Sequence, residues 1–304
     1  MLRLVLIGAV EGSKIAFDAL VGASLPPVLV VTLPPEAAHR HSDFVDLTEP
    51  ARQAGIAVFH TTNINAPASL DAIEKSEPDL CLVLGWSQIC RDQFRAIAQL
   101  GNVGFHPAAL PRLRGRAVIP WTILLGETTT GSTLFWLDEG VDSGAILMQK
   151  TFSVDEDETA RSLYAKHTGV LAQMLPEALA LVQSGNPPRI AQDHEQATYC
   201  ARRTPDDGLI DWHEPAAAVL RLIRAVGDPY PGAFSYQNGE RLVIDKAVLL
   251  PDSHRFIGLA GQVQCLTEGG FAVRCGDGIC IDVRAWRWQA GGRPKLHSKF
   301  GGDR

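Results

Sequence analysis

The amino-acid sequence predicts an α/β fold, a doubly wound and mostly parallel sheet, followed by a small antiparallel β-barrel. Short apolar runs alternate with stretches of helical spacing through the first part of the chain, as in parallel sheets covered on both faces. Closely spaced strand-like runs separated by turn residues fill the last part. The composition, 46% hydrophobic and 20% charged over 304 residues, is that of an ordinary globular protein.

Each expected element rests on a local pattern. Strands are expected at the apolar runs of residues 2–8, 27–33, 57–59, 80–85, 103–106 and 132–137. Helices are expected at residues 14–21, 49–54, 69–75 and 92–98 between those strands. Residues 155–184 are expected to form one long helix, because their acidic start suits the positive end of a helix dipole.

The character of the chain changes after residue 184. A Gly and Pro break followed by a polar stretch predicts a linker over residues 185–205, between a first domain of residues 1–184 and a second of residues 206–304. The second domain should hold a helix at residues 216–226. Its strands are expected at residues 234–236, 242–250, 262–266, 271–275 and 279–288.

The bulk properties exclude several classes of protein. The net charge of -6 gives no general attraction to phosphate backbones, so a nucleic-acid partner is not expected. No apolar run is long enough for a membrane helix, and the apolar start is cut short by Glu11, so we expect a cytoplasmic protein with no membrane partner. Six scattered cysteines without a Cys-x-x-Cys pair predict reduced thiols and no zinc site. His39 and His41 lack an evident third ligand, and we expect no metal.

His106 and Asp142 are the strongest candidates for chemistry. Pro107 ends the strand at His106, which therefore lies at the carboxyl edge where open α/β sheets bind ligands. If the strand before Asp142 is a parallel neighbour, the two side chains meet at that edge. A carboxylate beside an imidazole suits proton transfer. The alternative is that His106 is an ordinary surface residue and that Asp142 belongs to a turn.

The motifs around this pair resemble the folate-dependent formyltransferase family. They are His106, residues 110–115 (Leu-Pro-Arg-Leu-Arg-Gly), residues 130–133 (Thr-Gly-Ser-Thr) and residues 138–144 (Asp-Glu-Gly-Val-Asp-Ser-Gly). Residues 202–212 and 229–233 are similar to the start of the carboxyl domain in the methionyl-tRNA and nucleotide-sugar enzymes of that family. The resemblance covers nearly the whole chain.

The resemblance implies a fold and a reaction. It implies a Rossmann-like catalytic domain, an OB-like carboxyl domain and 10-formyltetrahydrofolate as the donor of a formyl group. His106 would handle the proton or the developing oxyanion, and Asp142 would orient and charge-balance it. The donor would lie between residues 86–91 and residues 138–142, and its expected contacts are Trp86, Ser87, Gln88, Ile89, Arg91, Asp138, Glu139, Gly140 and Val141.

One position departs from the family pattern. Gly104 stands where the family has an asparagine that stabilises the oxyanion. Asn102 faces the same way but lies about 7 Å farther along the strand, too far to substitute. We expect the space beside Gly104 to admit a water or a side chain, and Gln88 is the preferred replacement because it also carries an amide.

Three functions compete at this stage. The first is an N-formyltransferase for a small-molecule amine such as a nucleotide-linked amino sugar. The second is methionyl-tRNA formyltransferase, although residues 34–46 contain one arginine, Arg40, where that enzyme has a basic loop. The third is a non-catalytic folate- or ligand-binding homologue, suggested by Gly104. The sequence does not give the oligomeric state, and a homodimer stays one option.

Overall fold

The computed structural model describes residues 2–301 and contains two compact units. The first unit comprises residues 2–118, 129–154 and 164–201, and the second comprises residues 119–128, 155–163 and 202–301. The second unit therefore takes in two short segments that come from within the first part of the chain. The two units are described separately below.

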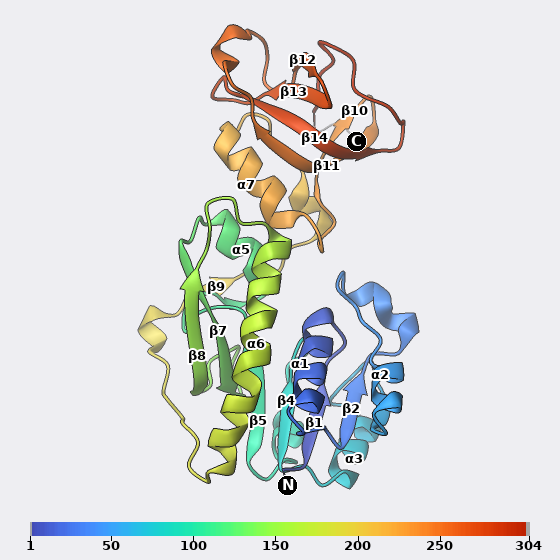
Figure 1. The fold of residues 1–304 in the computed structure, drawn as a ribbon, viewed down its shortest axis with the longest axis vertical. Helices are drawn as coiled ribbons and strands as arrows, with labels where there is room; N and C mark the ends of the chain where they lie inside the picture. The colour runs from blue at the N-terminus through green and yellow to red at the C-terminus, as the bar shows by residue number, and fades with distance from the viewer. Residues whose placement is uncertain (1, 302–304) are drawn as a thin grey trace. The chain divides into compact units, whose positions relative to one another are not determined.

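The first unit is built on a seven-stranded sheet with the order β3-β2-β1-β4-β5-β7-β8 (Figure 1). Five of its strands are β1 (Leu4–Ile7), β2 (Leu29–Thr32), β3 (Ala57–His60), β4 (Leu80–Val83) and β5 (Gly101–His106), and they run parallel. This confirms the predicted doubly wound, mostly parallel sheet.

Two antiparallel strands complete this sheet. β7 (Thr129–Trp136) pairs antiparallel with β5, and β8 (Ile146–Ser153) pairs antiparallel with β7. The assumption that the strand before Asp142 runs parallel to β5 was therefore wrong. The sequence prediction also missed β8, whose residues are mostly half-exposed at the edge of the sheet and so form no continuous apolar run.

Helices cover both faces of the sheet. On one face, Leu4 and Leu6 pack with residues of α1 (Glu11–Gly22), α2 (Thr48–Gln53) and α6 (Ala160–Gln183). On the other face, Val5 and Ile7 pack with α3 (Pro67–Lys75) and α4 (Asp92–Arg95). The alternation of β1 side chains between two apolar cores is the pattern of a strand buried on both faces. The remaining short elements of this unit are η1 (Pro35–Arg40), β6 (Arg114–Gly115), η2 (His194–Gln196) and β9 (Tyr199–Cys200). Residues 119–124 of α5 (Val118–Leu124) belong to the second unit.

The start of α6 differs from the prediction. The helix begins at Ala160, not at residue 155, because Thr159 and Ser162 form a reciprocal cap. The Thr159 hydroxyl accepts from the Ser162 N–H at 3.1 Å, and the Ser162 hydroxyl accepts from the Thr159 N–H at 3.0 Å. The acidic residues before Thr159 thus precede the helix instead of forming its first turn.

The second unit contains a five-stranded antiparallel sheet with the order β10-β11-β14-β13-β12. Its elements are η3 (Pro205–Gly208), α7 (Ala216–Val226), β10 (Ala233–Gln237), β11 (Glu240–Leu249), η4 (Ser253–Arg255), β12 (Val263–Thr267), β13 (Gly270–Arg274) and β14 (Cys280–Trp288). Single bridges join Gly301 to Tyr236 of β10 and Lys299 to Gln262 just before β12. The separate antiparallel domain is confirmed, and its OB-like character stays a prediction.

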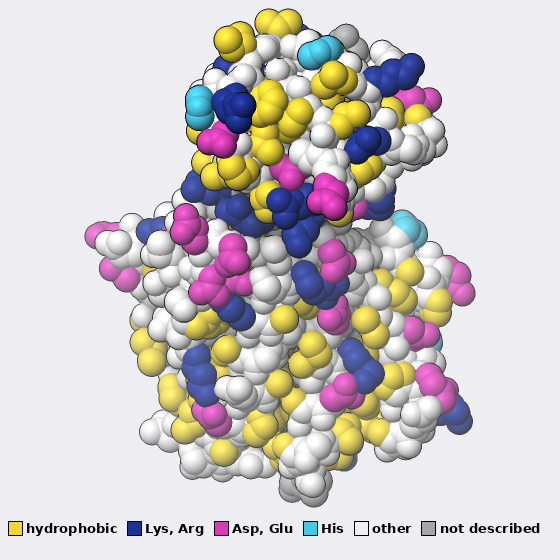
Figure 2. All heavy atoms as spheres, turned by 45° about the horizontal axis from the view of Figure 1, so that its top comes forward, with side chains coloured by type: hydrophobic (Ala, Val, Ile, Leu, Met, Phe, Trp, Pro, Cys, Tyr) yellow, Lys and Arg dark blue, Asp and Glu magenta, His cyan; other side chains and the backbone are white. Residues whose placement is uncertain are grey.

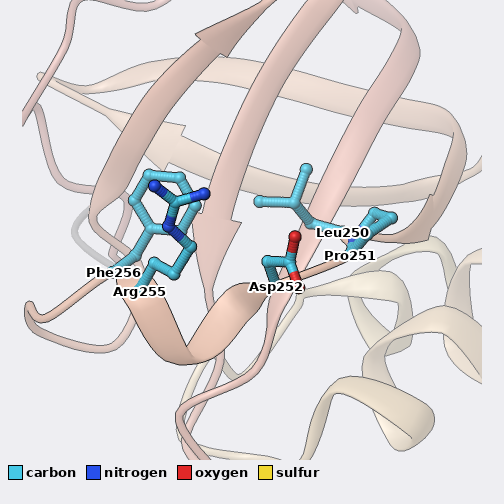
Figure 3. Close-up of a pocket in the computed structure, with 5 residues that line it drawn as sticks. All are labelled: Leu250, Pro251, Asp252, Arg255 and Phe256. Carbon is cyan, nitrogen blue, oxygen red and sulfur yellow. The ribbon is translucent and has the colours of Figure 1, made fainter.

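The surface of the second unit exposes several apolar side chains, which Figure 2 shows among charged ones. The most exposed large ones are Ile257 and Leu259. A hollow in this unit is lined by Leu250, Pro251, Asp252, Arg255 and Phe256 (Figure 3). It contains none of the predicted site residues. Within residues 2–301, no helix has the length and hydropathy needed to cross a bilayer.

Candidate active site

His106 ends β5 and is held in one orientation. Its side chain is almost fully buried, at 5% exposure, and its Nε2 lies 2.7 Å from the carbonyl oxygen of Leu113. Leu113 has a left-handed backbone, with φ of 57°. Because a carbonyl only accepts hydrogen bonds, Nε2 must carry the hydrogen that it donates. In the neutral ring, Nδ1 is then the nitrogen that can accept a proton.

Asp142 meets that nitrogen. Its Oδ2 lies 3.4 Å from Nδ1 of His106 and accepts a hydrogen bond of 2.8 Å from the Gly115 N–H. Asp142 also has a left-handed backbone, with φ of 50°, a conformation that costs free energy in a residue other than glycine and is often found at functional sites. The structure thus brings the two predicted catalytic residues together.

They meet for a different reason from the one expected. In the antiparallel pairing, Trp136 at the end of β7 lies opposite Val103 near the start of β5, and the Leu137 N–H bonds to the Asn102 carbonyl at 2.8 Å. The chain leaving β7 therefore starts about three strand residues, or roughly 10 Å, from His106. The loop of residues 137–144 carries Asp142 back over that distance.

The arrangement is suited to proton transfer. Nδ1 can take a proton from an attacking group, and the adjacent carboxylate stabilises the imidazolium that results. The Leu113 carbonyl holds the ring while this occurs. Within residues 2–301, no group of three His, Cys, Asp or Glu side chains forms a metal-binding cluster.

Gly104 lies in a filled position, not an open one. A Cβ placed on Gly104 would approach Cδ2 of Leu137 to 2.8 Å and the ring of Phe135 to 3.0 Å. Phe135 is the direct cross-strand partner of Gly104 on β7, and it is buried. The expectation of a space that admits a water was wrong, because an aromatic ring and a leucine occupy it.

Gln88 does not replace the asparagine. Its Oε1 accepts from the Ile64 N–H at 2.9 Å, and its Nε2 donates to the Thr62 carbonyl at 2.7 Å. Both ends of the amide therefore hold the preceding turn, and we withdraw Gln88 as the oxyanion donor. The amide nitrogen of Asn102 is also already used, since Nδ2 donates to the Arg95 carbonyl at 2.9 Å.

The two segments expected to hold the donor contact one apolar core. Trp86 of the first segment and Leu137, the residue just before the second, both pack against the cluster that contains Cys90 and Phe94. Ile89 and Val141 expose 60% and 46% of their surface, which leaves one apolar side chain free on each segment. Ser87 and Arg91 are exposed, and the Arg91 N–H is bonded to Asn65 at 2.9 Å.

The Asp138 carboxylate accepts hydrogen bonds from residues of its own loop. It accepts from the Gly140 N–H at 3.0 Å and from the Ser143 hydroxyl at 2.8 Å, while Glu139 is exposed. Trp86 Nε1 is buried and has no hydrogen-bond partner among the described residues. That free donor and the exposed apolar side chains leave both segments with groups available for a ligand.

A polar cluster surrounds the Tyr164 hydroxyl on α6. The Tyr164 hydroxyl donates to Asp43 at 2.7 Å and accepts from the Gly12 N–H at 3.0 Å, and burial, followed by the Asp43 charge, raises the pKa of Tyr164. Burial lowers the pKa of His41, Asp43 raises it, and the charges of Arg116 and Arg40 lower it further. Arg116 therefore acts electrostatically on this cluster, and it directly follows Gly115, which bonds to Asp142.

Sequence reasoning missed two functional candidates. Gln192 lies in the stretch read as a linker, yet it is buried and bonds to the backbone of Asp142. Arg114 entered only as part of a motif, but among residues 2–301 it is the largest fully buried side chain. The sequence holds no signal for Gln192, because a glutamine in a polar stretch is normally exposed. Only the three-dimensional contacts show that this one is buried.

His167 on α6 is a buried histidine near this site. Its Nδ1 lies 2.9 Å from the Ser132 hydroxyl, and its ring packs edge-on against Phe152 at 5.0 Å. Burial, followed by the nearby His106, lowers the pKa of His167 to about 3. His167 is therefore neutral in the folded protein at ordinary pH.

We expect this histidine to make the protein sensitive to acid. An unfolded histidine binds a proton near pH 6.5, whereas folded His167 stays neutral to about pH 3, so protonation favours unfolding as pH falls through this window. The free energy of unfolding should fall by up to about 1.4 kcal/mol per pH unit from this group. Urea unfolding at pH 7 and pH 5 should show a larger loss in wild type than in His167→Gln. Equal losses would contradict the assignment.

Comparison with known proteins identifies the family. The family model described as "Formyl transferase" matches residues 18–179, and the one described as "Formyl transferase, C-terminal domain" matches residues 202–298. The chain belongs to the formyltransferase family. It is a formyl-group transferase of the folate-dependent type, as the motifs around His106 predicted.

One curated relative of this formyltransferase is a methionyl-tRNA formyltransferase from Symbiobacterium thermophilum. The two are 32% identical over 283 residues, which cover 92% of this chain and 86% of the relative.

Solved structures share its fold. HypX from Aquifex aeolicus in complex with tetrahydrofolic acid has a TM-score of 0.69 at 18% identity, and the match covers 95% of this chain but only 44% of HypX. An N-formyltransferase from Helicobacter canadensis, in complex with folinic acid and dTDP-3-aminofucose, has a TM-score of 0.67 at 19% identity, with 93% and 99% of the two chains covered.

Proposed function

We propose that this formyltransferase moves a formyl group from 10-formyltetrahydrofolate to the amine of a small molecule, such as a nucleotide-linked amino sugar. The observation that carries the choice of acceptor is the folded state of residues 34–46. Phe44 bridges to Val10, and the Glu11 N–H donates to the Asp43 carbonyl at 2.9 Å. Tyr164 holds the Asp43 side chain.

This segment is unsuited to a nucleic acid. Its single arginine, Arg40, donates to the Thr62 carbonyl at 3.0 Å, and the segment also carries Glu36, Asp43 and Asp46. Binding of a tRNA gains most of its affinity from cations that neutralise phosphates. A closed, acidic segment instead suits a compact acceptor. The dTDP-linked amino sugar bound in the Helicobacter canadensis relative is an acceptor of that class.

The donor fits the two segments that contact one apolar core. Ile89 and Val141 would pack against the pterin, and the Trp86 Nε1–H and backbone groups of both segments would supply hydrogen bonds. Tetrahydrofolic acid and folinic acid in the solved relatives support the same class of ligand.

The reaction then follows from the orientation of His106. The acceptor nitrogen attacks the formyl carbon, a C–N bond forms, and the carbonyl becomes an oxyanion. Nδ1 of His106 takes the proton released by the amine, next to the Asp142 carboxylate. The bond to N10 of the folate breaks, N10 receives that proton, and tetrahydrofolate and the formylated amine leave. Gly104 offers no side-chain amide to this oxyanion, in contrast to the asparagine of the family pattern.

The identity of 32% with a methionyl-tRNA formyltransferase favours a second candidate function, formylation of methionyl-tRNA. The dependence of activity on salt concentration distinguishes the two acceptors. A protein that contacts 6–10 phosphates loses roughly 1,000- to 100,000-fold in affinity between 50 and 200 mM salt, whereas a single sugar nucleotide loses far less.

Arg116 gives a prediction for the anionic part of the acceptor. Its side chain is exposed and has no hydrogen bond or ion pair with another residue of the span 2–301. We expect Arg116→Ala to raise the KM for a nucleotide-linked amino sugar by about tenfold, because a charged hydrogen bond is worth roughly 1.5–3 kcal/mol before screening. The KM for 10-formyltetrahydrofolate should stay within about twofold.

The matched control is Arg52→Ala, which removes an exposed arginine paired with Glu49 on α2. It should leave both KM values unchanged. Steady-state kinetics with each substrate varied in turn measure the effect. An acceptor KM that does not change in Arg116→Ala would remove Arg116 from acceptor binding.

A further inference from the structure

Gln192 connects two parts of the site through all the hydrogen bonds that its amide can make. Its Oε1 accepts from Nε and Nη2 of Arg114 at 3.2 and 2.6 Å. Its Nε2 donates to the carbonyl oxygens of Asp142 at 2.9 Å and Gly144 at 2.7 Å. The residue is buried, at 6% exposure. One side chain therefore joins the loop that carries Asp142 to the motif segment that carries Arg114.

These contacts close a ring around Asp142. Gln192 holds the carbonyl of Asp142, and the Gly115 N–H holds its carboxylate. Gly115 is the chain neighbour of Arg114, which in turn holds Gln192. The main chain and the carboxylate of Asp142 are thus tied to adjacent residues of the same short strand, β6.

This ring has a specific task at Asp142. The left-handed backbone of Asp142 is unfavourable unless its surroundings fix it. The carboxylate also stands 3.4 Å from His106, a separation at which small shifts matter. Without the bond from Gln192, only the Gly115 N–H among the described residues would fix Asp142 on the side of β6.

Arg114 holds the side-chain amide of Gln192 in place. Arg114 is 1% exposed, and its guanidinium bonds to Gln192, to the Tyr199 hydroxyl at 3.1 Å and to Nδ1 of His194 at 3.2 Å. Within residues 2–301, no carboxylate pairs with it. A buried cation with neutral partners is sensitive to the loss of any one of them.

We infer that Gln192 is a positioning residue that holds Asp142 in register with His106. The inference rests on the proposed formyl transfer by that pair. Gln192 contacts the backbone of Asp142 and not a reacting group. Its loss should therefore lower turnover while leaving the binding of both substrates nearly unchanged.

Gln192→Glu tests the donor half of the amide alone. The new carboxylate keeps its contact with Arg114 and pairs with its charge, but an oxygen without a hydrogen now faces the carbonyls of Asp142 and Gly144. We expect kcat to fall by about 10- to 100-fold, as for a small misplacement of a reacting group, with both KM values within about twofold. Gln196→Glu, at an exposed position of η2, is the matched control and should match wild type.

A double-mutant cycle with Asp142→Asn distinguishes positioning from a general structural role. If Gln192 acts through Asp142, Gln192→Glu should cost little further activity once Asp142 has been replaced. Losses that multiply would overturn the inference. Gln192→Met is the second variant. It should show the same fall in kcat with a lower Tm, because it leaves Arg114 with fewer partners.

The cycle can be run with whichever amine wild type formylates, a nucleotide-linked amino sugar or methionyl-tRNA. A wrong acceptor therefore does not count against Gln192. A crystal structure of Gln192→Glu adds a readout that needs no activity. We expect the Asp142 carboxylate to have moved away from Nδ1 of His106. An unchanged position beside His106 would overturn the inference even if no acceptor were found.

Discussion

His106→Ala is expected to lower the turnover of formyl transfer by about 100- to 10,000-fold, the usual contribution of a positioned acid–base group. The reason is that, in the proposed reaction, Nδ1 of His106 accepts the proton, while Nε2 is held by the Leu113 carbonyl. Binding of folinic acid, measured by calorimetry, should stay near the wild-type value, because the two segments proposed to bind the donor do not include the imidazole.

Asp142→Ala should show a loss of similar size, and the double variant should be little slower than either single one. Residues that act as one unit give losses that do not multiply. Single-turnover rates for wild type, both single variants and the double variant measure the coupling. A double variant whose loss equals the product of the two single losses would show that His106 and Asp142 work independently.

Gly104→Asn is expected to destabilise the protein and to slow it further, although it restores the asparagine found in the family. A Cβ at Gly104 already approaches Leu137 to 2.8 Å and the Phe135 ring to 3.0 Å. Overpacking of this kind typically costs about 1–3 kcal/mol. Urea unfolding should show that loss, and single-turnover rates should not exceed those of wild type.

A companion variant tests the cause of that loss. Phe135→Leu removes the ring that faces Gly104, so Gly104→Asn should cost less stability in that background than in wild type. A Gly104→Asn variant that is as stable as wild type and turns over faster would show that the position is open. It would also show that the missing amide limits the rate.

Much of the fold follows from sequence pattern, and the failures have physical causes. Buried apolar runs identified β1, β2 and β4, because a parallel strand covered on both faces needs apolar residues at nearly every position. The direction of β7 was not predictable, since the period of a strand is the same in both directions. β8 was missed because an edge strand exposes part of its residues.

The sequence predicted that His106 and Asp142 lie close together, but it did not predict the residues that hold them there. The motifs identified His106 and Asp142, and the structure places them 3.4 Å apart. Gln88 was wrong as a replacement donor because its amide is used by the turn at Thr62 and Ile64, a contact that sequence spacing does not reveal. Gln192 could not be found in advance, because its role depends on the chain returning from a polar segment to the loop of Asp142.

The most direct test of the central claim is a search for the formylated product. The full chain is incubated with 10-formyltetrahydrofolate carrying an isotopically labelled formyl group, and with either a panel of nucleotide-linked amino sugars or initiator methionyl-tRNA. Mass spectrometry then follows the label. We expect it on the amine of a sugar nucleotide, at a rate that depends on His106 and Asp142. Label on methionyl-tRNA alone, or on no amine while folate is bound, would contradict the account.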